Sequence, residues 1–212
     1  MEKETIQIRK IRDGQWFEKS DEVALEHHLS IVLKDGSQVE VTCTPAHVEE
    51  LILGRRFLLR DVTEEEVELS EEIPLESVQL KDIFRIAGEM FECPGSLFQT
   101  TGCAHSCVLI KDGKVVFSAE DIGRHNALDK VIGYALKHGI SISGCAVFSS
   151  GRISKDYLQK AIAAGFRIVL SRAAVTGSAV ELAKKHHITL LGFIRKETAN
   201  IYHEGKVILN LS

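Results

Sequence analysis

The fold class follows from residues 115–137, which read VVFSAEDIGRHNALDKVIGYALK. The apolar run at Val115–Ala119 predicts a strand, and the apolar residues of Asn126–His138 recur at helical spacing. A similar order of strand, polar loop and helix recurs in the residues that follow. This alternation predicts an α/β protein with parallel strands and helices packed on the sheet. The other predicted strands are Phe98–Ile110, Cys145–Ser149, Arg167–Ser171, Thr189–Ile194 and one near Val207–Leu211, and the other helices are Lys155–Ala164 and Ser178–His187.

The first ninety residues are predicted to form a smaller, β-rich N-terminal part. Asp35-Gly36 between two apolar runs is a strong hairpin signal. We therefore expect two domains, residues 1–90 and residues 91–212. The predicted elements of the first part are strands at Thr5–Arg12, Leu29–Lys34 and Gln38–Thr42, a helix that opens at Pro45, an acidic exposed strand or loop at Asp61–Glu76, and a helix at Leu80–Phe91.

The composition excludes collagen-like and intrinsically disordered proteins. The chain has 212 residues, of which 44% are hydrophobic and 26% charged, as in ordinary globular proteins. It has neither an apolar run long enough to span a membrane nor a secretory leader, so we expect a cytoplasmic protein without membrane or nucleic-acid partners. Five cysteines, an odd number, are interpreted as thiols or ligands. Residues 1–90 carry 21 acidic and 11 basic side chains, and residues 91–212 carry 9 and 15, so the second part is the better candidate for binding an anionic ligand.

Three loops in the second part share one composition. The loops at 120–126, 149–154 and 171–178 each follow a predicted strand, precede a helix and contain glycine, arginine and hydroxyl or amide groups. One such loop is a routine helix cap, but three on successive strands favour a phosphate-bearing ligand at the sheet edge. Neither a Walker A loop nor a G-x-G-x-x-G turn is present, which argues against an ATPase or a dinucleotide dehydrogenase. The candidate ligand-binding residues are Gly123, Arg124, His125, Ser150, Gly151, Arg152 and Arg172.

Two further features admit a functional and a structural interpretation. Cys103, His105 and Cys107 would share one face of a strand, which suits either a zinc site or simple packing. Ligands at every second residue rarely close around a tetrahedral ion, so we expect no metal. His125 lies among acidic residues and is either a proton-transfer group or part of a loop held by its own hydrogen bonds.

Four motifs carry a resemblance to a known family. The runs FQTTGCAH, EDIGRHNALDKVIG, SSGRIS and LLGFIR followed by NIY occur between residues 97 and 203. In order and spacing they resemble the formate dehydrogenase accessory sulfurtransferase family (FdhD). The first ninety residues fit the family's β-rich N-terminal part more loosely.

The resemblance implies a fold, a ligand and partners. It implies a cytidine-deaminase-like mixed sheet with flanking helices, a homodimer, and transfer of sulfur from a cysteine desulfurase to the bis-molybdopterin guanine dinucleotide cofactor of formate dehydrogenase. The cofactor is bound as a substrate. The family's cofactor-binding stretch corresponds here to Phe193, Ile194, Arg195, Lys196, Glu197 and Thr198. The zinc signature of the deaminases is missing, so deamination is not implied.

The chain departs from the family at its sulfur-carrying motif. No C-x-x-C occurs in the sequence, and Ser70–Leu80, where the motif would lie, has no cysteine. Two hypotheses follow. The protein is a sulfurtransferase that uses another cysteine, with Cys93 and Cys103 as the candidates, or it is a non-catalytic chaperone that binds the molybdenum cofactor.

Overall fold

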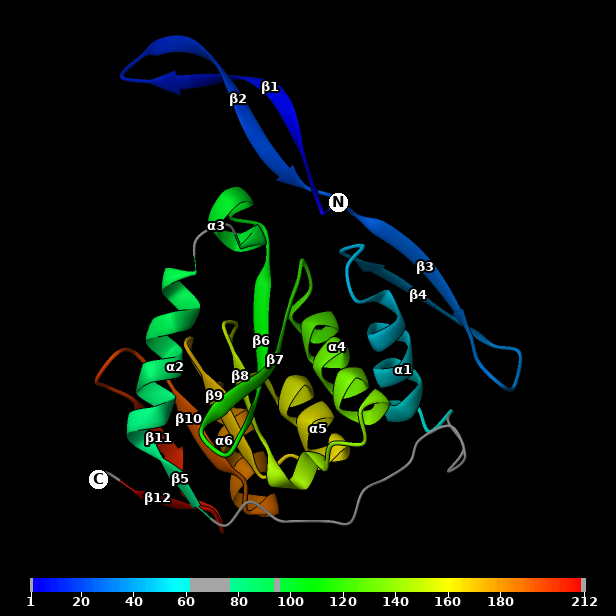
Figure 1. Cartoon of the computed structure of the whole chain (residues 1–212), viewed down its shortest axis with the longest axis vertical. Coiled ribbons are helices and arrows are strands. Elements are labelled where there is room, and N and C mark those ends of the chain that lie inside the picture. Colours follow the sequence, from blue (N-terminus) through cyan, green and yellow to red (C-terminus); the bar gives the residue numbers. More distant parts are fainter. Residues whose placement is uncertain (1, 62–76, 94–95, 211–212) are drawn as a thin grey trace.

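The computed structural model describes residues 2–61, 77–93 and 96–210. Its centre is a six-stranded sheet in the order β11-β10-β9-β8-β6-β7 (Figure 1). β8, β9 and β10 are parallel, β6 is antiparallel to both of its neighbours, and β11 is antiparallel to β10. The sheet is therefore mixed. Its strands are β6 (His105–Lys111), β7 (Lys114–Asp121), β8 (Ala146–Ser149), β9 (Ile168–Ser171), β10 (Thr189–Gly192) and β11 (Asn200–His203).

Helices cover both faces of the sheet. Alternate strand residues point to opposite faces, so Leu109 and Val147 join one buried cluster while Val108 and Phe148 join another. The first cluster lies under α4, α5 and α6, and the second lies under α2. These helices are α2 (Leu80–Glu92), α4 (Arg124–Lys137), α5 (Lys155–Ala164) and α6 (Gly177–His186).

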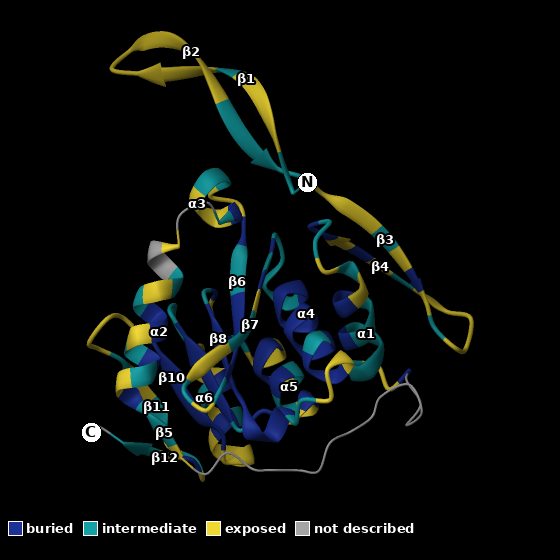
Figure 2. Cartoon of the chain, in the orientation of Figure 1, coloured by how far each residue is buried: buried dark blue, intermediate teal, exposed yellow. Residues whose placement is uncertain are grey.

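The N-terminal part adds two hairpins and one helix. β1 (Lys3–Arg12) pairs with β2 (Gln15–Ala24), and β3 (His27–Val32) pairs with β4 (Gln38–Cys43). The first hairpin projects away from the core and is largely exposed (Figure 2). α1 (Val48–Leu58) packs along α4, with glycines at the crossing. A β-carbon on Gly54 would overlap the carbonyl oxygen of Asp129, and one on Gly133 would overlap that of Glu50.

Short elements complete the fold. α3 (Leu97–Thr101) lies near the amino end of β6, and a 3-10 turn (Ile142–Gly144) precedes β8. β5 (Ser77–Gln79) pairs in parallel with β12 (Ile208–Asn210). Among the described residues, no helix is both long enough and apolar enough to cross a membrane.

The α/β fold and most predicted elements are confirmed, with two corrections. The predicted strand Phe98–Ile110 is wrong at its start, because Ser96 caps a helix and Gly102, at φ 69°, ends it. The expectation of parallel strands is wrong for β6, because the tight turn at Asp112-Gly113 makes β6 and β7 an antiparallel hairpin. β2 and β11 were not predicted. Most of the acidic segment Asp61–Glu76 lies outside the described residues.

The predicted domain boundary near residue 90 falls inside α2. This helix buries Ile83 and Ile86 in the same cluster as the sheet residues Phe148 and Leu170. The division into domains at that point stays a prediction.

Candidate functional site

The candidate site lies at the edge where the carboxyl ends of β7, β8, β9 and β10 meet the amino end of β6. Strand register fixes this arrangement, since His105 pairs with Asp121 and Ser149 pairs with Ser171. In open α/β sheets ligands bind beyond the carboxyl ends of strands. The three glycine–arginine loops predicted from the sequence all begin at this edge.

A cavity of about 540 Å³ opens at this edge. Cys103 and His105 line it on the side of β6, Ser150 and Arg172 come from the loops after β8 and β9, and Arg195 follows β10. Its volume lies within the range of small-molecule sites, about 300–1,000 Å³. The remaining lining residues are Met90, Ser96, Phe98, Gln99, Gly102, Ala104, Ser106, Ile122 and Ala173.

Buried serines hold the loops after β8 and β9 in place. Ser149 Oγ accepts a hydrogen bond from the Gly151 amide at 3.1 Å, and Ser171 Oγ donates to the Gly151 carbonyl at 2.7 Å. The Ala173 amide donates to Ser171 Oγ at 2.9 Å. Both loops are therefore fixed before any ligand binds, which reduces the entropic cost of binding.

Gly151 is required by close packing. A β-carbon at this position would lie 3.2 Å from His105 Nδ1 and 3.3 Å from the Arg124 side chain. The backbone of the loop thus packs directly against both side chains.

Positive charge gathers around the cavity. Arg195 donates hydrogen bonds to the carbonyl oxygens of Arg172 and Ile194, and Arg124 Nη2 donates to Ser154 Oγ at 3.3 Å. Burial and the neighbouring Arg195 lower the pKa of Arg172. Arginine forks at such an edge suit phosphate or carboxylate groups.

His105 lies half-buried in the wall of the cavity. Burial lowers the pKa of its imidazole, and the charges of Arg124 and Arg152 lower it further. A neutral imidazole can accept or donate a proton near neutral pH. From the sequence, His105 is predicted only as a possible metal ligand and not as a residue of the binding site.

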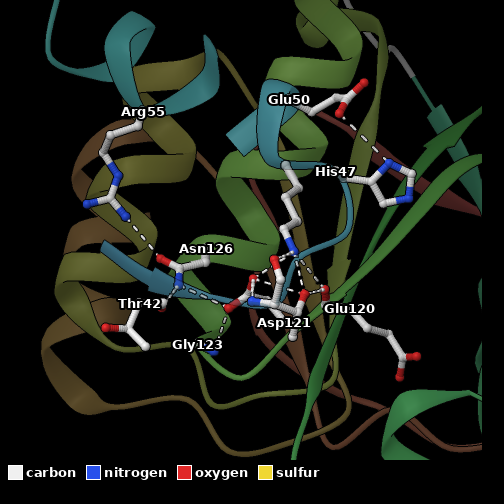
Figure 3. Close-up of polar contacts among 10 residues, drawn as sticks. Thr42, His47, Glu50, Arg55, Glu120, Asp121, Gly123 and Asn126 are labelled. Atoms are coloured by element: carbon white, nitrogen blue, oxygen red, sulfur yellow. Dashed lines mark hydrogen bonds and ion pairs between the residues drawn. The ribbon is translucent and has the colours of Figure 1, made fainter. Parts of the chain in front are cut away.

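The motif at 120–130 contributes to the scaffold and also places Arg124 beside the loop after β8. Asp121 and Lys130 are completely buried with their charged atoms 2.7 Å apart, and Asn126 donates to Thr42 and Asp121 (Figure 3). The Arg124 side chain instead lies beside Gly151 in the loop after β8. Asp121, Asn126 and Lys130 therefore fasten the N-terminal part to the sheet through Thr42 and Thr44.

A second group of buried charges lies around Asp129 on α4. The Asp129 carboxylate accepts hydrogen bonds from Arg55 Nε and Lys160 Nζ, each at 2.6 Å. Nearby, His125 Nε2 lies 3.0 Å from Asp156 Oδ2, and burial lowers the pKa of this histidine. His125 thus has an acidic neighbour, and its interpretations as a proton-transfer group and as part of a loop held by its own hydrogen bonds both stay open.

The five cysteines separate into two groups. Cys93 and Cys103 are exposed, while Cys43, Cys107 and Cys145 are buried. Burial raises the pKa of Cys107 to about 12 and that of Cys145 to about 11. Cys93 lines a neighbouring groove that shares Met90, Ser96 and Ser106 with the cavity.

The shared strand face predicted for Cys103, His105 and Cys107 is wrong. Cys103 precedes the strand, whereas Cys107 points into the core against Tyr157, 3.6 Å away. In the part of the chain that the structure describes, no group of three His, Cys, Asp or Glu side chains is placed to hold a metal ion.

The residues of the stretch 193–198 differ in their burial and in what they contact. Ile194 is buried in the core, and Phe193 adopts a left-handed backbone conformation with φ 52°. Arg195 reaches the cavity, and its amide donates to the Thr198 carbonyl at 2.8 Å. Lys196 lies against Gly88 of α2, and Glu197 is exposed. The stretch contributes one arginine to the cavity and one buried anchor, Ile194.

Curated relatives are similar over nearly the whole chain. A sulfur carrier protein FdhD from Listeria innocua is 30% identical, with 92% of this chain and 94% of the relative covered. One from Geobacillus kaustophilus is 30% identical, with 95% and 96% covered. The first alignment spans 247 positions, more than the 212 residues of this chain, so the relative has insertions that this chain lacks.

A solved structure and a family model agree with these relatives. A protein from Desulfotalea psychrophila, assigned as a formate dehydrogenase accessory protein, matches with a TM-score of 0.85 and 27% identity, over 96% of this chain and 97% of that one. The model of the FdhD/NarQ family matches residues 60–209, which include the whole site edge. The chain belongs to the FdhD/NarQ family.

Proposed function

We propose that the protein is a formate dehydrogenase accessory protein that carries sulfur. It would receive sulfur from a cysteine desulfurase and deliver it to bis-molybdopterin guanine dinucleotide held at the cavity. The observation that carries this proposal is the presence of an exposed cysteine, Cys103, in the wall of a cavity lined by Arg172 and Arg195. Relatives named sulfur carrier proteins support it.

The cavity suits one nucleotide half of that cofactor. Arg172 and Arg195 offer guanidinium groups to a pyrophosphate, and Ser150 and Gln99 offer polar side chains. Charge pairing of this kind weakens as salt rises. The proposed cofactor-binding residues are therefore these groups together with Arg124 and Arg152.

Cys103 is a better sulfur acceptor than Cys93. Both thiols are exposed, but only Cys103 lies in the arginine-lined cavity where the cofactor is proposed to bind. The Cys103 thiolate would attack the terminal sulfur of the desulfurase persulfide. The sulfur–sulfur bond of the donor breaks, the desulfurase leaves as a thiolate, and Cys103 becomes a persulfide.

The second candidate function is a chaperone that binds the cofactor without carrying sulfur. Two observations favour it, the lack of a C-x-x-C in this sequence and the insertions of the relatives that this chain lacks. Incubation with a cysteine desulfurase separates the two functions, because only the carrier acquires protein-bound sulfane sulfur.

We further propose that the protein works in the cytoplasm as a homodimer. Ile6, Ile11, Trp16 and Phe17 are exposed on the projecting hairpin, and an isolated two-stranded hairpin is marginally stable in water. Coverage by a second chain would supply the missing contacts. Light scattering at micromolar concentration tests the dimer, and a monomeric mass would contradict it.

Ligand binding is tested with guanosine diphosphate as half of the cofactor. Titration calorimetry on wild type should detect binding that weakens with salt. Arg172→Ala should weaken it about tenfold to a hundredfold, the effect of losing about 1.5–3 kcal/mol of charged hydrogen bonding. Arg167→Ala is the matched control, because Arg167 precedes the opposite end of the same strand. Undetectable wild-type binding, or equal effects of the two variants, would contradict this site.

A further inference from the structure

The Glu120 carboxylate ties the segment that carries Cys103 to the sheet. Glu120 lies on β7 directly opposite Ser106 of β6, and its side chain points away from the buried cluster of Asp121 and Asn126 (Figure 3). Glu120 Oε2 accepts the Leu97 amide at 2.7 Å, and Oε1 accepts the Phe98 amide at 3.2 Å. Ser106 Oγ also donates to Oε1, at 3.3 Å.

These bonds complete the start of α3. The first amides of a helix have no partner within the helix, and a five-residue helix has few other bonds to stabilise it. Ser96 Oγ accepts the Gln99 amide at 3.1 Å, so Glu120 and Ser96 together satisfy the first three amides. Bonds to an ionised acceptor are stronger than neutral ones.

Further hydrogen bonds connect Glu120 through α3 to Cys103. The Leu97 carbonyl accepts Thr101 Oγ1 at 2.7 Å, and Thr101 Oγ1 accepts the Cys103 amide at 3.0 Å. Three hydrogen bonds therefore run in series from the Glu120 carboxylate through Leu97 and Thr101 to the backbone of Cys103. Gly102 between them takes the left-handed conformation that ends the helix and turns the chain toward the cavity.

We propose that Glu120 and Thr101 are positioning residues that hold the Cys103 thiol at the arginine-lined cavity. Neither residue lines the cavity, and each acts on Cys103 through the chain of bonds. The functional meaning of this placement rests on the proposed sulfur-carrier function, but the placement itself is measurable without sulfur or cofactor.

Amide hydrogen exchange of the full-length protein is the test. Exchange reports local opening, which the loss of a charged hydrogen bond promotes. Glu120→Ala should speed exchange at Leu97, Phe98 and Cys103 by about tenfold or more. Thr101→Val should speed exchange at Cys103 but leave Leu97 within about twofold, because the Glu120 bond to Leu97 remains.

Conservative variants separate positioning from damage to the fold. Thr101→Ser keeps the hydroxyl and should restore the slow exchange of Cys103, and Glu120→Gln keeps one acceptor oxygen and should give an intermediate rate. Ser118→Ala, two residues before Glu120 on β7, should match wild type. Unchanged exchange at Cys103 in both Glu120→Ala and Thr101→Val would overturn the proposal, as would equal acceleration at Leu97 in the two variants.

Alkylation of Cys103 is a second measurement, and it relates the Glu120 hydrogen bonds to ligand binding in the cavity. Guanosine diphosphate should shield Cys103 from iodoacetamide in wild type, and this shielding should fall in Glu120→Ala. A wild type without shielding contradicts ligand binding at the cavity, while the exchange data still decide the positioning role. Ligand binding at the cavity and the positioning role of Glu120 and Thr101 can therefore be refuted independently.

Discussion

Lys130 Nζ lies 2.7 Å from Asp121 Oδ2, and both side chains are completely buried. Asp121 Oδ2 also accepts the Thr44 amide at 3.0 Å, and Lys130 donates to Thr44 Oγ1 at 2.7 Å and to the Glu120 carbonyl at 3.1 Å. The pair thus joins the end of β4 to the turn that leads into α4. The pair thereby holds the start of the loop that contains Gly123 and Arg124 in place.

Removing one partner of this pair should be costly. Lys130→Met leaves the Asp121 carboxylate buried without its counter-charge, so the free energy of unfolding should fall by about 3–5 kcal/mol. Urea denaturation followed by circular dichroism measures it. Lys184→Met is the control, because Lys184 pairs with Glu181 on the exposed side of α6 and its loss should cost only about 0–1 kcal/mol. Equal losses in the two variants would contradict the role assigned to the buried pair.

The contact between α1 and α4 should tolerate no side chain at Gly133. Gly133→Ala must push the Glu50 carbonyl away, which costs about 1–3 kcal/mol or more. Gly177→Ala is a matched substitution with open space around the new methyl group, and it should leave the melting temperature unchanged or slightly higher. A Gly133→Ala protein as stable as wild type would show that the helices are not in backbone contact.

The imidazole of His105 should titrate below its ordinary range. Burial, Arg124 and Arg152 lower its pKa, so as the pH falls the unfolded chain binds this proton first. The stability that neutral His105 contributes is present above the unfolded pKa of about 6.5 and is lost as the pH falls through the lowered folded value.

Proton NMR of the His105 ring measures this shift. Arg152→Ala removes one of the two nearby positive charges and should raise the pKa of His105, whereas Arg167→Ala should not change it. A pKa at or above about 6.5 in wild type would be inconsistent with the burial of this ring.

Native cysteines should differ sharply in reactivity. Iodoacetamide at pH 8 should alkylate Cys93 and Cys103, and leave Cys43, Cys107 and Cys145 unmodified, because burial excludes the reagent and raises the pKa of each of these three thiols. In urea all five should react. Site-resolved mass spectrometry measures the rates, and rapid native alkylation of Cys107 would contradict its placement against Tyr157.

Local patterns in the sequence predict most of the core but not its connections. The helical spacing of Ala127, Leu128 and Val131 and the apolar run at Val115–Ala119 correctly place α4 and β7, because most of these apolar side chains face the core. The strand predicted at Phe98–Ile110 is wrong over α3, because Ser96 and Gly102 cap a short helix there.

The site is predictable in part for the same reason. The glycine–arginine loops after β7, β8 and β9 are local features, and the carboxyl ends of these strands do meet at one edge. The contribution of His105 and the bonds of Glu120 to α3 depend on strand pairing across many residues, which no local pattern contains. Asp121 and Asp129 are also indistinguishable in sequence from solvent-facing acids, yet both are fully buried.

The most direct test of the account is the site of sulfur attachment. The protein is incubated with a cysteine desulfurase and cysteine, and its peptides are analysed by mass spectrometry without reduction. We expect one added sulfur atom on Cys103, retained in Cys93→Ser and lost in Cys103→Ser. Sulfur confined to Cys93 or to a buried cysteine, or no sulfur on any cysteine, would contradict it.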